Sequence, residues 1–351
     1  MQKLEELNIL CFGKLQKEAE EKLSHCRSLN IADRLGPFSA QEMAEKLQNF
    51  DVVISEPLDN LRAEVLSQCP ALKMIAQRAV GFDNVDLDYA TKNSILVSNT
   101  PGVLDNATAD LAFALLLAAA RRIVEGDNYV RQGKWQGFEN DLLLGREISG
   151  KTLGIIGMGR IGQAMARRAH GFGLDIIYTR SNENDSTVFS TKSKDAKDAE
   201  LLSTFGARRV ALGELLKESD FITVHCPLNA STTSLLGARE FKMMRKHCLL
   251  INTSRGKVVD QDALICALQE KELGGAALDV FVDEPNVPQA LIDLPNVVLA
   301  PHIGSATTET RLNMTLLAVN SIVEAFSGIL PKNVLNGKIY QDFQNRTAVR
   351  K

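Results

Sequence analysis

The fold of this chain is decided by the stretch Thr152-Leu153-Gly154-Ile155-Ile156-Gly157-Met158-Gly159-Arg160-Ile161-Gly162. An apolar run rich in β-branched residues leads into a G-x-G-x-x-G pattern, and a helix-forming segment follows from Gln163 to Gly171. In this context the first glycine permits a tight turn, the second lets the backbone approach a pyrophosphate, and the third lets the helix pack on the strand. Free N–H groups at the start of the helix attract phosphate oxygens. The stretch therefore predicts the first βα unit of a dinucleotide-binding sheet.

Two series of strand candidates alternate with helical segments, a pattern that indicates parallel sheets. The first series consists of Leu7–Phe12, Asp51–Ser55, Leu72–Ala76 and Ile95–Ser98, and the second of Thr152–Ile156, Asp175–Tyr178, Phe221–His225, Leu249–Asn252, Gly275–Val280 and Val297–Ala300. Between them, the segment from Asn106 to Arg122 is apolar around nearly its whole circumference, so we expect a buried helix there. A last helix, Thr308 to Ser327, is expected to return to the first series.

The predicted fold class is therefore α/β, with two Rossmann-like parallel-sheet domains. A discontinuous, flavodoxin-like substrate domain would span residues 1–104 and be completed by residues 302–351. A doubly wound NAD(P)-binding domain would span residues 105–301, since six strands with intervening helices make up such a fold.

Composition excludes several classes of function. The chain has 351 residues, of which 45% are hydrophobic and 24% charged, and this suggests a soluble protein of two domains. A net charge of −3 offers no electrostatic reason to bind nucleic acid or an anionic membrane. The six cysteines include no C-x-x-C pair, so we expect reduced thiols, no metal site and a cytoplasmic location. The longest apolar stretch, Leu111 to Ala120, is half the length that a membrane span needs.

Three side chains in the second half of the chain each come shortly after one of the last three strand candidates. They are Arg255, Glu284 and His302. Ligands of an open parallel sheet bind beyond the carboxyl ends of its strands. We therefore expect a cation, an acid and an imidazole to face one cleft together with the dinucleotide.

This set of groups suits the reduction of a ketone that lies beside a carboxylate. Arg255 can hold the carboxylate and polarise the ketone through paired N–H donors. His302 is the expected general acid, because imidazole titrates near neutrality, and Glu284 against the other ring nitrogen would fix the tautomer. Each residue also has a structural alternative, as a surface ion pair, a turn residue or a buried histidine. Their coincidence on successive strand ends favours catalysis.

The end of the second strand of the dinucleotide unit predicts which dinucleotide is preferred. NAD-specific folds place an acid there to bind the ribose 2′-hydroxyl. This chain reads Tyr178-Thr179-Arg180-Ser181 at that point, and Asp175 lies at the other end of the strand. A guanidinium with neighbouring hydroxyls suits a 2′-phosphate, so we expect NADP(H) to be preferred and NAD(H) to be usable. The alternative is that Arg180 is a solvated loop residue.

The polar stretch from Asn182 to Ala199 is expected to be a mobile surface insertion.

Four motifs, in this order, resemble the D-isomer-specific 2-hydroxyacid dehydrogenase family. They are the turn Gly157–Gly162, Asn252-Thr253-Ser254-Arg255-Gly256, Leu278-Asp279-Val280-Phe281 with Glu284-Pro285, and Pro301-His302-Ile303-Gly304-Ser305. The resemblance covers about residues 50 to 330. Within the family the chain is most similar to the glyoxylate/hydroxypyruvate reductases, through Asn99–Leu104, Ala107–Arg122 and Gly133-Lys134-Trp135.

The resemblance implies further site residues. Backbone amides of Val80 and Gly81 would bind the substrate carboxylate, together with Arg255 and His302. From the motifs and the resemblance together, the expected cofactor contacts are Thr108, Gly157, Gly159, Arg160, Ile161, Gly162, Arg180, Ser181, Pro227, Thr253, Asp279 and Gly304. Trp135 and Phe138 lie where relatives use an arm that closes the partner subunit's active site, although a core or interface role is equally expected for Phe138. A homodimer is expected.

The expected function is reduction of small 2-oxo acids with NADPH, from glyoxylate to glycolate and from hydroxypyruvate to D-glycerate. One alternative is a 2-ketogluconate-type sugar-acid reductase. Another is a dinucleotide-sensing binding protein similar to the corepressor branch of the family, which keeps the same three residues. Corepressors usually carry a long disordered tail, and this chain stops soon after its last helix, which favours the enzyme.

Overall fold

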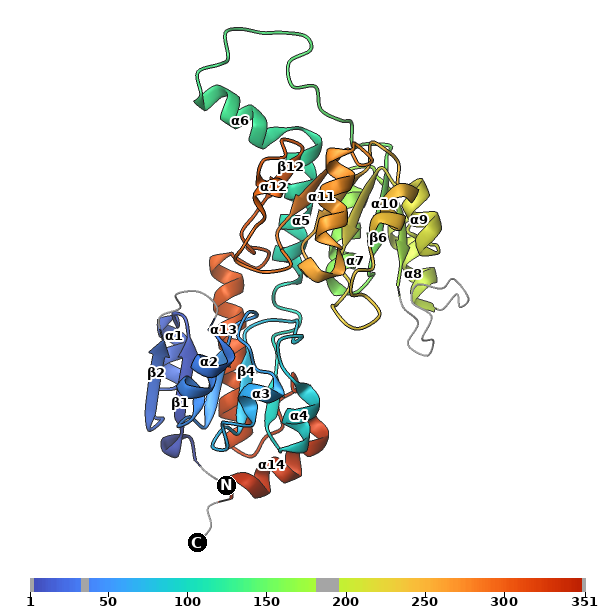
Figure 1. Ribbon diagram of the computed structural model, residues 1–351. Coiled ribbons are helices and arrows are strands. Elements are labelled where there is room, and N and C mark those ends of the chain that lie inside the picture. The colour runs from blue at the N-terminus through green and yellow to red at the C-terminus, as the bar shows by residue number, and fades with distance from the viewer. Residues whose placement is uncertain (1–2, 33–37, 181–195, 349–351) are drawn as a thin grey trace. The chain divides into compact units, whose positions relative to one another are not determined.

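The computed structural model of the chain describes residues 3–32, 38–180 and 196–348, arranged in two units (Figure 1). The first unit comprises Met1–Leu104 with Ser305–Lys351, and the second comprises Asp105–Gly304. The second unit thus ends three residues later than the sequence suggested, and His302 belongs to it. Ser181 and most of the polar stretch that follows it lie outside the described residues.

The first unit contains a five-stranded parallel sheet of order β2-β1-β3-β4-β5. Its strands are β1 (Asn8–Phe12), β2 (Ser28–Ala32), β3 (Val52–Ser55), β4 (Met74–Gln77) and β5 (Leu96–Ser98). Its helices are α1 (Lys17–Lys22), α2 (Ala40–Leu47), α3 (Ala63–Leu66), α4 (Leu87–Lys92), α13 (Thr308–Phe326) and α14 (Tyr340–Thr347). This strand order is the flavodoxin-like one, as predicted. Strand β2 was not predicted.

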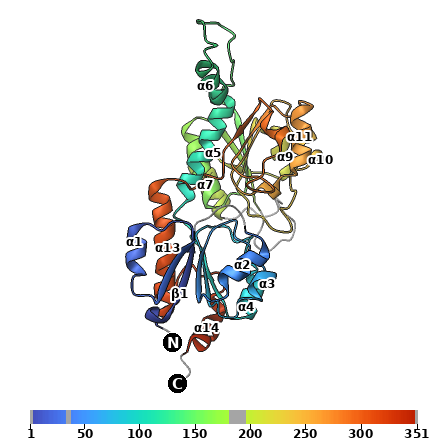
Figure 2. The same ribbon diagram turned by 60° about the vertical axis from the view of Figure 1, so that its left-hand side comes forward.

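Alternate side chains of these strands supply two separate cores. Ile9 and Ile54 pack on one face against α1, α13 and α14, whereas Leu10 and Val53 pack on the other against α2, α3 and α4. Figure 2 shows α1 and α13 on one side of the strands and α2, α3 and α4 on the other. Burial of both faces explains why β1, β3, β4 and β5 are nearly continuous apolar runs rather than alternating ones.

The second unit contains a seven-stranded parallel sheet of order β12-β11-β10-β9-β6-β7-β8. The strands are β6 (Thr152–Ile156), β7 (Asp175–Thr179), β8 (Arg208–Arg209), β9 (Phe221–Val224), β10 (Leu249–Asn252), β11 (Gly275–Leu278) and β12 (Val297–Leu299). The helices are α5 (Asp105–Ala120), α6 (Ile123–Arg131), α7 (Arg160–Gly171), α8 (Ala196–Phe205), α9 (Leu212–Glu218), α10 (Ala238–Met243), α11 (Gln261–Gln269) and α12 (Gln289–Ile292). This is the doubly wound order, and its switch point lies between β6 and β9.

Helices cover both faces of this sheet as well. Residues of α5, α7 and α8 share one hydrophobic core, and residues of α9 to α12 share the other. Helix α5 was expected to be buried all round, but within the described chain it is buried on one side only. Its other side carries an exposed stripe formed by Asn106, Asp110 and Ala114. Of the described residues, no helix combines the length and apolar character needed to span a membrane. Nor do they include a group of three His, Cys, Asp or Glu side chains placed to hold a metal ion.

Candidate active site

The glycine-rich turn after β6 has the geometry that a dinucleotide pyrophosphate requires. Gly157 adopts φ +98°, and a Cβ there would lie 2.6 Å from the backbone nitrogen of Cys226, which follows β9. A Cβ on Gly162 would lie 2.2 Å from the carbonyl oxygen of Gly157, so the helix packs directly on the turn. Gly159 caps α7 and has open space where a Cβ would stand. The N–H groups of Arg160 and Ile161 therefore begin a twelve-residue helix beside an open backbone surface.

His225 and Pro227 follow β9 at this switch point, and Pro227 was expected to contact the cofactor. Pro227 is exposed, and its carbonyl oxygen accepts a hydrogen bond from Thr232 Oγ1 at 2.6 Å. The ring of His225 lies with Nε2 2.9 Å from Thr223 Oγ1. Burial lowers the pKa of His225 to about 4, so this imidazole is neutral near pH 7 and is unsuited to donate protons there.

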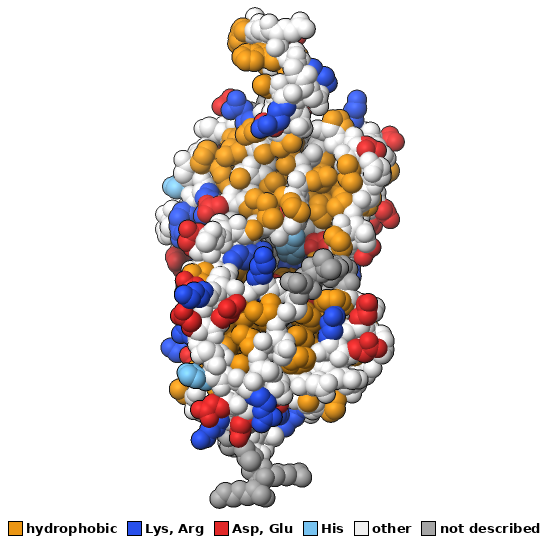
Figure 3. Space-filling model, turned by 90° about the vertical axis from the view of Figure 1, so that its left-hand side faces the viewer, with side chains coloured by type: hydrophobic (Ala, Val, Ile, Leu, Met, Phe, Trp, Pro, Cys, Tyr) orange, Lys and Arg blue, Asp and Glu red, His pale blue; other side chains and the backbone are white. Residues whose placement is uncertain are grey.

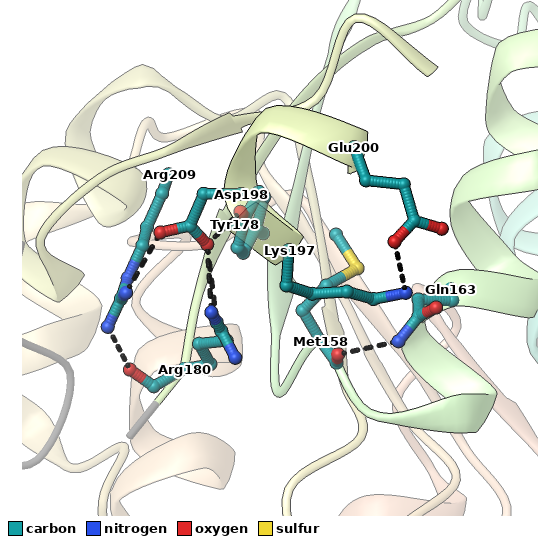
Figure 4. Close-up of polar contacts among 8 residues, drawn as sticks. All are labelled: Met158, Gln163, Tyr178, Arg180, Lys197, Asp198, Glu200 and Arg209. Atoms are coloured by element: carbon teal, nitrogen blue, oxygen red, sulfur yellow. Dashed lines mark hydrogen bonds and ion pairs between the residues drawn. The ribbon is translucent and has the colours of Figure 1, made fainter. Parts of the chain in front are cut away.

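An acid does reach the end of β7, contrary to the sequence prediction (Figure 4). Asp198 lies on α8, is 8% exposed, and pairs with the guanidinium of Arg180 at 3.1 Å. Its other oxygen pairs with Arg209 of β8 at 3.1 Å. Tyr178 donates its hydroxyl to the same carboxylate at 2.6 Å. The prediction of a surface insertion up to Ala199 is therefore wrong at its end, where α8 begins at Ala196 and buries Asp198.

A second group of predicted cofactor contacts lies together at the carboxyl ends of β11 and β12. Asp279 accepts hydrogen bonds from the backbone N–H groups of Ile303 at 2.7 Å and Gly304 at 2.8 Å. A Cβ on Gly304 would lie 3.5 Å from Thr108 Cγ2, which places α5 beside this turn. Burial raises the pKa of Asp279 although the two N–H donors oppose the shift. Thr253 also lies after β10, with its Oγ1 buried and without a partner among the described residues.

His302 and Glu284 form a direct hydrogen bond. His302 Nδ1 lies 2.6 Å from Glu284 Oε2, and the exposed fractions of the two side chains are 28% and 10%. The other carboxylate oxygen, Oε1, accepts the backbone N–H of Phe281 at 3.0 Å. Because a carboxylate only accepts, Nδ1 carries the proton, and Nε2 is the ring nitrogen that can exchange a proton with a ligand. The two residues thus have the orientation of an acid–base pair.

The backbone of His302 is held in a left-handed conformation by Asp279. His302 has φ +54°, which for a residue other than glycine costs about 1–2 kcal/mol. Its N–H donates to the backbone carbonyl of Asp279 at 2.9 Å, and the Asp279 side chain takes the next two N–H groups. These three hydrogen bonds offset the strain and fix the direction of the imidazole.

Arg255 follows β10, the neighbour of β11, and its loop packs against the loop that carries Glu284. A Cβ on Gly256 would lie 2.0 Å from the carbonyl carbon of Phe281, so only glycine allows this close approach. The side chain of Arg255 is partly exposed, and its Nη1 donates to the Ser254 carbonyl at 2.9 Å. The structure thus brings all three predicted catalytic residues to adjacent strand ends of one sheet.

The loop of Val80 and Gly81, which is expected to bind a carboxylate, lies in the first unit. Two of the carbonyl groups in this loop accept hydrogen bonds from neighbouring residues. Asn99 donates to the carbonyl of Val80 at 2.8 Å, and the backbone N–H of Thr100 donates to Ala79 at 2.9 Å. In a trans peptide the N–H points opposite to the carbonyl of the preceding residue. The N–H groups of Val80 and Gly81 are therefore directed away from Asn99 and Thr100.

Sequence reasoning missed Asp198 and Arg209. A signal for Asp198 existed, because Asp198, Leu201 and Phe205 share one helical face, and Leu201 is buried. An acid on such a face needs a cationic partner. For Arg209 there was no comparable signal, since β8 consists of only two residues.

Comparisons with known proteins agree with this arrangement. A family model described as the NAD-binding domain of D-isomer-specific 2-hydroxyacid dehydrogenases matches residues 113–304. A glyoxylate reductase of Thermococcus litoralis is 49% identical over 298 residues, which cover 84% of this chain and 86% of that protein.

Two solved structures share the fold and were determined with nicotinamide dinucleotides. An NADPH-dependent glyoxylate/hydroxypyruvate reductase of Sinorhizobium meliloti, in complex with NADP and malonate, is 31% identical with a TM-score of 0.77, and the match covers 94% of this chain and 96% of that one. A D-lactate dehydrogenase of Aquifex aeolicus, complexed with NAD and lactic acid, is 29% identical with a TM-score of 0.79, over 94% and 99% of the two chains. The protein described here uses a nicotinamide dinucleotide and belongs to the D-isomer-specific 2-hydroxyacid dehydrogenase family of oxidoreductases.

Proposed function

We propose that the protein is an NADPH-preferring reductase of small 2-oxo acids, which converts glyoxylate to glycolate and hydroxypyruvate to D-glycerate. The observation that carries the proposal is the 2.6 Å hydrogen bond between His302 and Glu284 at the strand ends that follow the dinucleotide turn. The names of the similar reductases support the choice of substrate. In this proposal the second unit binds the dinucleotide and carries Arg255, Glu284 and His302, and backbone amides of the first unit also bind the substrate carboxylate.

His302 is the proposed general acid. Its Nε2 donates a proton to the substrate carbonyl oxygen, while Glu284 accepts from Nδ1 and stabilises the imidazolium. The bound nicotinamide supplies the hydride that reduces the carbonyl carbon. Positioned acid catalysis of this kind contributes roughly a hundred- to ten-thousandfold in rate.

Arg255 is proposed to bind the substrate carboxylate and to polarise the ketone. A guanidinium presents parallel N–H donors that match a carboxylate, and the close packing of Gly256 holds the loop of Arg255 against that of Glu284. The backbone N–H groups of Val80 and Gly81 are proposed as further donors to the carboxylate.

The cofactor preference is proposed from Arg180. Its guanidinium stands at the end of β7, where an NAD-specific fold has an acid that binds the ribose. Asp198 does not replace that acid, because it is buried and accepts from Tyr178, Arg180 and Arg209. A guanidinium with 23% exposure can bind a 2′-phosphate.

Steady-state kinetics on the purified protein test the proposal. We expect kcat/KM to be higher with NADPH than with NADH, and higher with glyoxylate or hydroxypyruvate than with 2-ketogluconate. His302→Ala should lower kcat by about a hundredfold or more. His25→Ala, at an exposed histidine of the first unit, is the control and should leave kcat unchanged. Absence of turnover with every 2-oxo acid would favour the binding-protein alternative, and a faster reaction with 2-ketogluconate would favour the sugar-acid reductase.

A homodimer is proposed from the arm formed by α6 and residues 132–146. Large apolar side chains are exposed here, among them Trp135 at 59% and Phe138 at 87%. Figure 1 shows α6 projecting from the rest of its unit, and Figure 3 shows hydrophobic side chains gathered on one face of that unit. Apolar areas of this kind mark interfaces. Light scattering should show a dimer, and Trp135→Ser with Phe138→Ser should increase the monomer fraction; an unchanged dimer would contradict the role of the arm.

We also propose that the protein works in the cytoplasm. All six cysteines are present as free thiols, which is typical of proteins kept in a reducing compartment. Fractionation of cells that express the tagged protein tests this location.

A further inference from the structure

The carboxylate of Asp198 is shared between two guanidinium groups at the end of β7. Oδ1 pairs with Arg180 at 3.1 Å, and Oδ2 pairs with Arg209 at 3.1 Å (Figure 4). Arg209 also donates to the backbone carbonyl of Arg180 at 3.2 Å. Its side chain is only 5% exposed, whereas that of Arg180 is 23% exposed. Arg180 is therefore the more accessible of the two cations, and Arg209 lies behind it.

This sharing changes what Arg180 can offer to an anion. A carboxylate that belonged to Arg180 alone would form a one-to-one ion pair with it and would repel a phosphate dianion nearby. Because Asp198 also pairs with Arg209, the two guanidinium groups and the carboxylate together carry one net positive charge. This charge attracts a phosphate that approaches the more accessible guanidinium of Arg180. The low exposure of Asp198, 8%, makes the effect stronger than it would be in water.

We propose that Arg209 determines the preference for a 2′-phosphate without touching the cofactor, by sharing Asp198 with Arg180. Arg209 is thus a positioning residue that sets the net charge of the cluster around Arg180. The inference rests on the proposed preference for NADPH and adds the residue that sets it. Asp198 comes from α8 and not from β7, and its pairing with Arg209 allows a phosphorylated ribose to bind beside it.

Calorimetric binding of adenosine 2′,5′-bisphosphate and of 5′-AMP tests the inference without turnover, since the two probes differ only in the 2′-phosphate. Arg209→Gln should lower the ratio of their affinities by about ten- to hundredfold, because the charges of Asp198 and Arg180 then cancel. Arg209→Lys keeps the charge and should keep the ratio within about threefold of the unmodified protein. In the double variant Asp198→Asn with Arg209→Gln both charges are removed, and the ratio should recover to within about threefold.

Arg208→Gln is the matched control. Arg208 precedes Arg209 on the same strand and carries the same charge, but its side chain is 52% exposed and pairs with Glu214 and Glu218. This variant should leave the ratio unchanged. The inference would be overturned if Arg208→Gln and Arg209→Gln lowered the affinity ratio equally. It would also be overturned if the ratio of the double variant were no higher than that of Arg209→Gln. If Arg209→Gln does not fold, the Arg209→Lys and double variants still decide it, because a ratio that falls in both contradicts charge sharing. An unmodified protein that binds the bisphosphate no better than 5′-AMP would instead refute the proposed NADPH preference itself.

Discussion

Glu284→Gln is the substitution that most directly tests the acid–base pair. It keeps the size of the side chain, and the amide oxygen of the variant can still accept the N–H of Phe281, which lies 3.0 Å from Oε1. The amide nitrogen would then face His302 Nδ1, where a carboxylate now lies at 2.6 Å. The variant therefore loses a hydrogen bond between charged partners when the imidazole is protonated. Neither side chain is more than 28% exposed, so solvent screens this interaction only partly.

The magnitude follows from this geometry. A hydrogen bond to a charged group contributes about 1.5–3 kcal/mol, and its loss from the transition state corresponds to a rate about ten- to hundredfold lower. We expect kcat for glyoxylate reduction at pH 7 to fall by about this factor.

The assay is kcat for glyoxylate reduction with saturating NADPH at about pH 7. Asp283→Asn provides the control, since Asp283 is an exposed carboxylate of the same loop, bonded to Asn286 at 3.1 Å. It should leave kcat unchanged. A Glu284→Gln enzyme with unaltered kcat would refute the assigned role of Glu284.

Two further predictions concern packing and acid stability. Gly256→Ala would place a Cβ 2.0 Å from the carbonyl carbon of Phe281, so the two loops must separate by about 1 Å. We expect this variant to lose about 1–3 kcal/mol of stability and up to about a hundredfold in kcat/KM, and normal rates would show that the close packing is dispensable. Asp220 has its pKa lowered because hydrogen bonds from His247, Arg245 and a backbone N–H outweigh its burial. This stabilisation is complete above about pH 4 and is lost as the pH falls through the lowered pKa, so Asp220→Asn should lower the melting temperature at pH 7 and flatten its decline in acid. An identical acid decline in both proteins would contradict this assignment.

The parts of the fold that sequence predicts well are those buried on both faces. Strands such as Thr152–Ile156 and Leu249–Asn252 are uninterrupted apolar runs because helices cover both sides of the sheet. The two strands that were missed are edge strands. Ser28–Ala32 has no fully buried residue, and Arg208–Arg209 is short and charged. An edge strand can pair through its backbone without apolar side chains, as these two do, and a hydrophobicity pattern does not reveal a strand of this kind.

The same reasoning separates the site residues that could be predicted from those that could not. Glu284 and His302 follow recognisable strands, and the carboxyl ends of adjacent parallel strands meet at one edge. Asp198 is a tertiary contact made by a helix that begins after fifteen residues outside the described chain. Its polar surroundings in the sequence favoured a loop. Its pairing with two arginines and its hydrogen bond from Tyr178 explain why an acid is buried there.

The division of labour between the two units has a practical consequence for protein engineering. The glycine turn, the arginine cluster and the pair of His302 with Glu284 all lie in Asp105–Gly304, whereas the loop of Val80 and Gly81 lies in the other unit. Hybrid chains can be made by grafting Asp105–Gly304 into another family member. Such hybrids should carry over the proposed coenzyme choice of this protein, together with Arg255 and His302, while the host supplies the loop that corresponds to Val80 and Gly81.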